Sequence, residues 1–223
     1  MIFDLIRNGL SLELIVNLCV RVFIIFCVLP IHEFAHGYVA YKLGDNTAKL
    51  KGRLTMNPLA HVDPFGALMV VFVGFGYARP VPVNIGNFKR GKRKQYMAFT
   101  AFAGPVSNLI MATIFTFIYC LISYKFINAN EYMRIIALFC SLAAQINISL
   151  AVFNLLPIPP LDGSRILSAF LPDRIYFKIM QYERIIVLIV FALLFMNILD
   201  VPIALISGII ESLIMKLCQI PFT

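Results

Sequence analysis

The stretch FCVLPIHEFAHGYVAYKLGD (residues 26–45) places His32, Glu33 and His36 at the end of an apolar run that is long enough to enter a membrane. An ionisable side chain inside a bilayer costs about 3 kcal/mol on insertion scales. Three such side chains within two helical turns need a compensating interaction. The nature of that interaction indicates what the protein does.

The composition of the whole chain is typical of a membrane protein. Of the 223 residues, 61% are hydrophobic and 13% are charged, whereas soluble domains average about 45–50% and 25%. The mean hydropathy is +0.88. We therefore expect an all-α polytopic membrane protein, built as a bundle of about four to six transmembrane helices. The length suits a single membrane-embedded domain over residues 1–223, with a core at about 20–170 and C-terminal helices at 185–217.

The apolar segments give the expected order of elements. Three of them are long enough to cross a bilayer, at residues 14–41, 97–124 and 135–156. Residues 185–199 and 201–217 form either one long kinked helix or a tight pair. Residues 65–77 are apolar but shorter than the roughly 20 residues that a span requires, so we expect a re-entrant segment. The following GFGYARPVPVN (74–84) is rich in Gly, Pro and alternating Val, which predicts a small β-hairpin or an extended strand.

The distribution of basic residues predicts the orientation of these segments. The net charge is +8, and Lys and Arg concentrate between apolar segments, where they meet anionic lipid, so we expect no nucleic-acid partner. The positive-inside rule places residues 42–95 and 163–184 in the cytoplasm and the N-terminus outside. We therefore expect a multi-pass protein of the cell membrane whose active site faces the cytoplasmic side.

The spacing of His32, Glu33 and His36 predicts a metal site with an adjacent base. Positions i and i+4 lie on one helix face, so both imidazoles can reach one zinc ion at about 2.0–2.1 Å. Glu33 lies about 100° away around the helix axis, where it misses the ion but reaches a bound water. The alternative is a chance match, with histidines hydrogen-bonded in a bundle core.

A catalytic zinc ion needs a third protein ligand. Asp162, in NLLPIPPLDGSRIL (154–167), lies where the third span reaches the same side of the membrane as His32 and His36. Prolines before it block a regular helix, and Gly163 permits a turn beside the carboxylate. The alternative role for Asp162 is a cap at the start of the following helix.

These motifs together resemble the site-2 protease family of intramembrane zinc metalloproteases, in its compact prokaryotic branch without PDZ or CBS domains. The resemblance covers about residues 20–170. It is carried by HEFAH (32–36), GRLTMNPLAHVDPFG (52–66), ARPVPVN (78–84), AGPVSN (103–108) and NLLPIPPLDG (154–163). The resemblance implies that His32, His36 and Asp162 bind one Zn2+ per chain and that Glu33 is the general base and acid.

Other polar residues of these motifs have open roles. Asn154 donates either to the developing oxyanion or to a neighbouring helix. Residues 79–84, with Asn84 at their end, either present an edge to an extended substrate or form a plain hairpin. His61, close to Asp63, is expected to make a polar contact rather than to bind the metal. Gly104 is expected to allow close packing of the second span.

The predicted function is a zinc-dependent intramembrane endopeptidase. It would hydrolyse a peptide bond within or near the cytoplasmic end of a transmembrane protein or peptide substrate, in contact with the lipid bilayer. One alternative is a membrane transporter that uses the His/Glu/Asp cluster as a proton or metal relay, and another is a non-catalytic membrane interaction protein. The sequence does not specify the substrate, the cleaved bond, the regulation or the oligomeric state.

Overall fold

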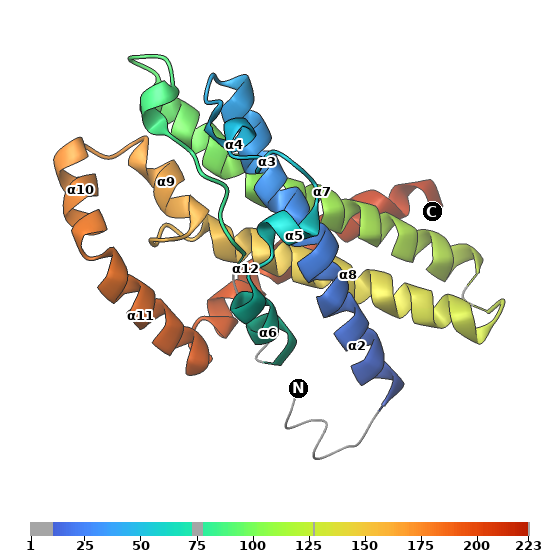
Figure 1. Ribbon diagram of the computed structural model, residues 1–223. Coiled ribbons are helices and arrows are strands. Elements are labelled where there is room, and N and C mark those ends of the chain that lie inside the picture. Colours follow the sequence, from blue (N-terminus) through green and yellow to red (C-terminus); the bar gives the residue numbers. More distant parts are fainter. Residues whose placement is uncertain (1–10, 73–77, 127, 223) are drawn as a thin grey trace.

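The computed structural model describes residues 11–72, 78–126 and 128–222, and all regular secondary structure in this part of the chain is helical (Figure 1). Four helical stretches are long and apolar enough to cross a membrane, namely Leu12–Lys42, Arg93–Lys125, Glu131–Leu155 and Asp200–Phe222. The expectation of an all-α membrane protein is therefore confirmed for the described residues, and their four candidate spans agree with the predicted bundle of about four to six helices.

The first of these stretches changes its helical pitch just before the His/Glu cluster. It consists of α2 (Leu12–Phe23), a π-helical turn η1 (Ile24–Val28) and α3 (Leu29–Lys42). The Leu29 N–H bonds to the carbonyl of Ile24, five residues back. Pro30 follows directly, and a proline has no N–H and clashes with the preceding turn of a regular α-helix. The wider turn accommodates the proline and lets the helix continue into the cluster.

Two long helices form the scaffold on which this first span packs. α7 (Arg93–Lys125) and α8 (Glu131–Leu155) run antiparallel, and α3 lies across α7 (Figure 1). The core between the spans is apolar and includes small residues of α8, which let the helices approach closely. Its buried members are Val16, Val20, Ile24, Val28, Phe115, Cys140, Ala143 and Ala144.

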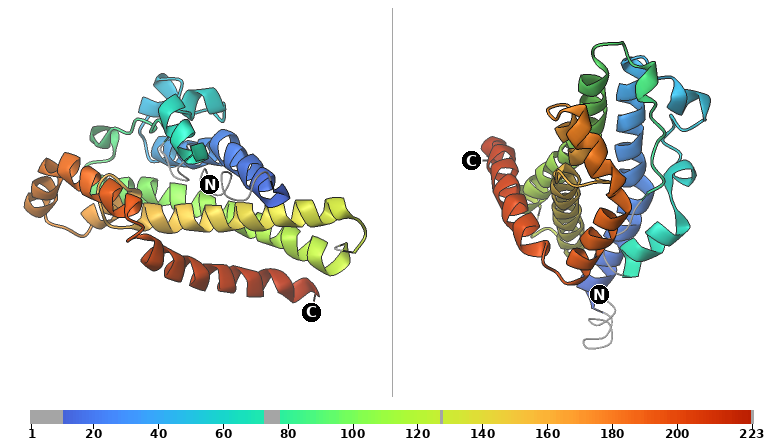
Figure 2. Two further views of the ribbon diagram at one scale, coloured as in Figure 1. Left: turned by 90° about the horizontal axis from the view of Figure 1, so that it is seen from below. Right: turned by 90° about the vertical axis from the view of Figure 1, so that its left-hand side faces the viewer.

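The C-terminal half adds four helices of very different packing. α9 (Asp162–Ser168) lies against α7, and α10 (Asp173–Gln181) leads into α11 (Glu183–Phe195). α12 (Asp200–Gln219) packs against α7 and α8 on the face away from α3 (Figure 2). It ends in the short η3 (Ile220–Phe222).

The structure decides between the two alternatives for residues 185–217. α11 and α12 are separate helices, because the chain breaks at residues 196–199, where Asn197 has a φ of 57°. Asparagine tolerates this left-handed conformation better than most residues do. Pro202 lies in the first turn of α12, where no helical N–H bond is lost.

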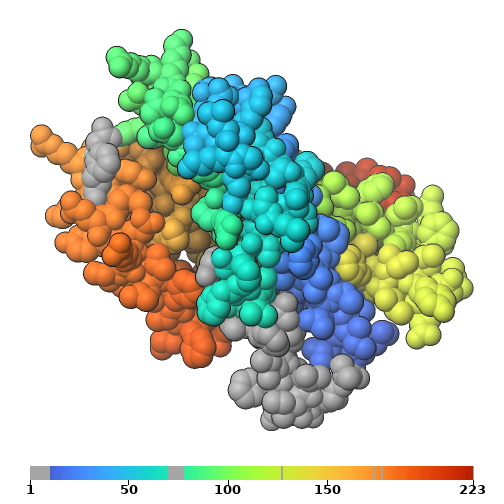
Figure 3. All heavy atoms as spheres, viewed as in Figure 1, coloured from blue at the N-terminus to red at the C-terminus, as the bar shows by residue number. Residues whose placement is uncertain are grey.

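Short helices connect the first two spans. α4 (Thr47–Leu50) and α5 (Pro58–His61) cover α3 on the face shown in Figure 3. α6 (Pro64–Phe72) packs against α2. The remainder of the predicted re-entrant segment, residues 73–77, lies outside the described residues. η2 (Ile85–Asn87) precedes α7.

The predicted β-hairpin is not supported, because residues 78–84 form no strand pairing with any described segment. Pro80 and Pro82 have no N–H to donate. The N–H groups of Arg79, Val81 and Asn84 bond instead to the His61 carbonyl, the Glu33 carboxylate and the Asp45 carboxylate. The segment is therefore extended, but side chains and a carbonyl of α5 replace a neighbouring strand.

Candidate metal centre

Three potential metal ligands converge at the junction of α3, α7 and α9. His32 and His36 project from one face of α3, and their Nε2 atoms lie 3.1 Å apart. The Oδ2 atom of Asp162, the first residue of α9, lies 3.4 Å from His32 Nε2 and 3.2 Å from His36 Nε2. All three residues are buried. The structure thus brings together two parts of the chain that are about 130 residues apart, a separation that follows from the residue numbers.

The spacing of these donor atoms fits a tetrahedral zinc ion. Zinc bonds of about 2.0–2.1 Å at tetrahedral angles separate two ligand atoms by about 3.3 Å. His36 Nδ1 lies 2.7 Å from the Thr100 carbonyl, a contact that requires a proton on Nδ1 and, in the neutral ring, leaves a lone pair on Nε2 that can bind a metal ion. The two Nε2 atoms and the carboxylate oxygen are close enough to one another to bind a single ion together.

Helix α7 forms one wall of the metal centre through a glycine. A Cβ atom placed on Gly104 would lie 2.3 Å from His36 Nε2 and 2.6 Å from His32 Cε1. No larger residue fits there without moving an imidazole. The carbonyl of Thr100, one turn earlier on α7, orients the His36 ring. The Thr100 contact could not be predicted from the sequence, because every residue has a backbone carbonyl.

The position of Asp162 depends on how the chain turns after α8. That helix ends at Leu155, and α9 starts seven residues later. A Cβ atom on Gly163 would lie 2.2 Å from the Leu155 carbonyl oxygen and 2.4 Å from that of Leu156. Glycine is therefore required for close approach between the start of α9 and the end of α8, and this approach delivers the carboxylate to the histidines.

Glu33 lies beside the three ligands but outside their group. It is buried, and its Oε2 atom accepts a hydrogen bond of 2.8 Å from the Val81 N–H in the extended segment 78–84. One carboxylate oxygen is thus held by the protein backbone. An ionised carboxylate has a second oxygen with two lone pairs, which remains a potential proton acceptor.

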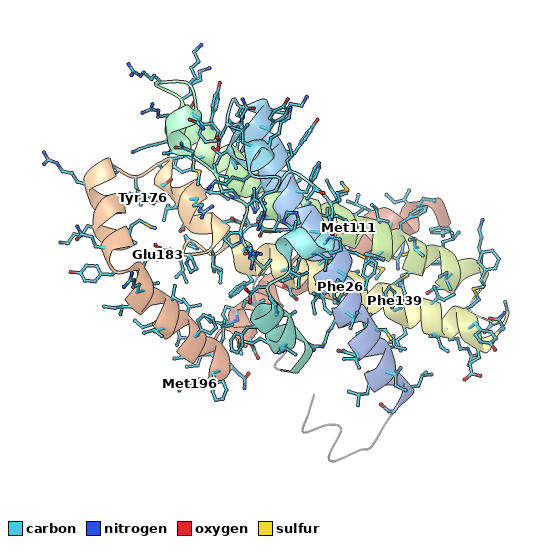
Figure 4. The ribbon with its side chains drawn as sticks, in the orientation of Figure 1. Phe26, Met111, Phe139, Tyr176, Glu183 and Met196 are labelled. Atoms are coloured by element: carbon cyan, nitrogen blue, oxygen red, sulfur yellow. The ribbon has the colours of Figure 1, made fainter. Side chains whose placement is uncertain are left out.

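A cavity of about 540 Å³ contains these groups. Its lining includes His32, Glu33, His36, Asp162 and the predicted residue Asn154. The Asn154 Nδ2 atom donates to the Leu150 carbonyl at 3.0 Å, within its own helix. Arg165 and Glu183 add charge to an otherwise largely apolar lining. Glu183 lies at the start of α11, near the space between α11 and α9 (Figure 4).

Two other predicted residues lie away from the cavity lining. Asn84 caps η2, because its Oδ1 atom accepts from the Gly86 N–H at 2.9 Å. His61 is fully buried, and its Nε2 atom lies 2.7 Å from the Thr55 carbonyl. It takes no part in the metal-ligand group found among the described residues. His61 thus makes a local polar contact within the loop that covers α3.

Comparison with known sequences assigns the family. The sequence model of Peptidase family M50 matches residues 20–199. The chain belongs to this family. The "Putative zinc metalloprotease YwhC" of Bacillus subtilis (strain 168) is 46% identical over 153 residues, which cover 68% of this chain and 69% of that relative.

More distant relatives of this M50 peptidase carry a similar name. "Putative zinc metalloprotease Rip2" of Mycolicibacterium smegmatis is 26% identical over 140 residues, and its namesake in Mycobacterium tuberculosis is 26% identical over 141 residues. Each match covers 60% of this chain and 51% of the relative, so the chain spans about half the length of these two proteins. No solved structure matches the chain significantly.

Family and geometry together identify the class of function. The M50 match, the zinc metalloprotease relatives and the His32–His36–Asp162 group agree on a membrane zinc metalloprotease of the site-2 type. Zinc is its cofactor. The transporter alternative explains buried ionisable groups, but it explains neither the family match nor the tetrahedral spacing of the donor atoms.

Proposed function

We propose that this M50 peptidase hydrolyses a peptide bond in a transmembrane substrate segment, near its cytoplasmic end. In this proposal His32, His36 and Asp162 hold one Zn2+, and Glu33 is the general base and acid. The observation that carries the proposal is the triangle of donor atoms with edges of 3.1, 3.2 and 3.4 Å, with Glu33 in the same cavity.

The chemistry divides between the metal and the side chains. A bound zinc ion lowers the pKa of its water toward 7 and polarises the scissile carbonyl. Glu33 accepts the water proton on Oε1, since Oε2 is bonded to the Val81 N–H. The same carboxyl group then delivers that proton to the leaving amine nitrogen. Asp162 and the oriented His36 ring keep the ligand geometry fixed during this transfer.

Asn154 is proposed to stabilise the developing negative charge on the substrate carbonyl oxygen. Its amide lines the cavity, and one N–H of its Nδ2 group is bonded to the Leu150 carbonyl. The second N–H of this group remains for an oxyanion. The hydrogen bond from Asn154 to the Leu150 carbonyl of α8 would then hold the amide in position.

Residues 79–84 are proposed to bind the unwound substrate as an added strand. A transmembrane helix hides its peptide bonds in its own hydrogen bonds, so a substrate must first become extended. Within the described range 79–83, Pro80 and Pro82 have no N–H, and the N–H groups of Arg79 and Val81 bond to other parts of the protein. The Val83 N–H bonds to no other described group, so it could pair with a substrate strand. Asn84 would contribute by fixing the end of this strand at η2.

The membrane placement is also part of the proposal. The charge distribution favours a cytoplasmic location for residues 42–95 and 163–184, with the site near that face and the N-terminus outside. A re-entrant course for residues 65–77 is proposed from the sequence, because this apolar run is shorter than a membrane span requires. We propose that residues 1–223 act as one membrane-embedded unit and that the substrate is a membrane protein or peptide.

The Glu33→Gln variant tests the proposed mechanism. We expect the purified variant to bind one zinc ion per chain, measured by mass spectrometry of the metal, but to cleave no single-span reporter that the native enzyme cleaves in the same liposomes. Glu131→Gln is the matched control, because Glu131 lies in the exposed first turn of α8. Cleavage by Glu33→Gln at the native rate would refute the role of Glu33.

A further inference from the structure

The extended segment 78–84 is fixed to α3 and its C-terminal loop at two points that lie three residues apart. The Val81 N–H donates to Glu33 Oε2 at 2.8 Å, and the Asn84 N–H donates to Asp45 Oδ2 at 2.6 Å. The Val81 side chain is buried, and a Cβ atom on Gly37 would lie 3.1 Å from its Cγ1 atom. The segment is therefore pressed against α3, and carboxylates fix its register there.

Asp45 is the more elaborate of the two anchors. Its side chain is only 1% exposed and is not part of the cavity lining. It also accepts hydrogen bonds from the Thr47 N–H at 3.0 Å, from the Thr47 hydroxyl and from Asn87 Nδ2 at 2.7 Å. Asn84, which precedes η2, and Asn87, which ends it, both donate hydrogen bonds to this carboxylate. One buried carboxylate thus connects the C-terminal end of α3 to both ends of η2.

We infer that Asp45 is a positioning residue for catalysis, which holds residues 81–84 in the register that lets the Val81 N–H fix one oxygen of Glu33. This inference rests on the proposed role of Glu33 as general base. A base must lie within hydrogen-bond reach of the proton that it removes. A carboxylate bonded at one oxygen cannot turn freely, so its other oxygen stays directed into the cavity.

The expected effect follows from the sensitivity of catalysis to geometry. A displacement of about 1 Å by a mutation far from the reacting atoms can reduce the rate about 100-fold. Asp45→Ala removes the anchor while all three proposed metal ligands remain. We therefore expect kcat to fall at least about 10-fold, and any rise in KM through the proposed substrate strand to be smaller than this decrease.

The test compares Asp45→Ala with Asp63→Ala in the zinc-loaded enzyme. Asp63 is the matched control, because it also accepts two backbone N–H groups, from Phe65 and Gly66, and has no hydrogen bond to the described residues 78–84. Hydrogen exchange of the peptide that covers 78–88 gives a readout independent of activity. We expect faster exchange in this peptide for Asp45→Ala, unchanged exchange for Asp63→Ala, and one zinc ion per chain in both.

The possible results separate the inference from the proposed function. If Asp45→Ala matches Asp63→Ala in kcat, or raises KM with kcat unchanged, the positioning role is refuted. If Glu33→Gln cleaves normally, the proposed function fails whatever Asp45 does. Asn87→Ala removes one bond to Asp45 and one to the Thr47 hydroxyl, keeps the Asp45 carboxylate, and is the milder variant to use if Asp45→Ala does not fold. A kcat decrease in the same direction is then expected, and native kcat would overturn the inference.

Discussion

The two walls of the cavity are built very differently. In α3, six of fourteen residues are buried, and they include both histidines and Glu33, whereas in α11 only Val190 is buried among thirteen. The α3 wall contacts α7 so closely that only glycine fits at position 104. The α11 wall presents apolar side chains to the cavity and exposes Leu188 and Phe195 on its surface.

This difference separates the demands of chemistry from those of substrate binding. Metal ligation and proton transfer require atoms held to within a fraction of an ångström, which dense packing provides. Contact with an apolar substrate segment requires only matching polarity, because lipid tails are as apolar as the side chains of α11. Substitutions on the α3 side should therefore affect catalysis much more than substitutions in α11.

The largest effect is expected for Asp162→Ala. Removal of the carboxylate leaves two histidines, so that one of the three proposed protein ligands of the zinc ion is lost. We expect zinc to be lost during purification and cleavage to be abolished, as measured by metal content and reporter cleavage. Asp63→Ala, which removes a carboxylate from a loop, should retain the metal. Full zinc occupancy in Asp162→Ala would remove this residue from the site.

A slightly smaller effect is expected for Gly104→Ala, which tests the close contact between α7 and the two histidines of α3. The added methyl group would displace His36 or His32, so we expect zinc affinity to fall at least about 10-fold, the range known for changes around metal ligands. Gly208→Ala in α12 is the matched control, because nothing lies within 4 Å of a Cβ atom there. Equal zinc affinity in the two variants would show that the contact between position 104 and the histidine rings does not limit metal binding.

Substitutions in α11 should have weaker effects that are confined to substrate binding. Val190→Ala shortens a buried side chain in the cavity lining, and we expect it to change KM for a transmembrane reporter by a few-fold while zinc content stays native. Leu188→Ala alters the exposed face of the same helix and should change neither quantity. Loss of zinc in Val190→Ala would mean that α11 belongs to the tightly packed region.

The smallest expected effect is the pH dependence of the Asp45 anchor. Burial alone would raise the pKa of Asp45, but hydrogen bonds from Thr47, Asn84 and Asn87 outweigh burial and lower it. A lowered pKa in the folded state means that the carboxylate stabilises the fold above its ordinary pKa of about 4 and loses this contribution as the pH falls below that value. Native protein and Asp45→Asn should therefore differ in thermal stability at pH 7 and at pH 5, and converge toward pH 3. A difference that persists unchanged at pH 3 would contradict this account.

Local sequence patterns determined much of this protein. The apolar runs predicted the membrane spans, because their length and polarity decide whether a helix is stable in lipid. The i, i+4 spacing placed His32 and His36 on one face, since helical geometry fixes that relation without any other contact. The same spacing separated Glu33 from the pair.

Tertiary structure alone decided how these parts meet. Residues 78–84 look like a hairpin, but their N–H groups bond to Glu33 and Asp45, which lie about 40–50 residues earlier in the chain and cannot be recognised as partners from local patterns. The orientation of His36 depends on a backbone carbonyl of α7, and the chain direction after α11 depends on the conformation of one asparagine. These features are contacts between residues far apart in the sequence or the value of a single backbone angle. Neither kind of feature produces a periodic pattern in the sequence from which it could be predicted.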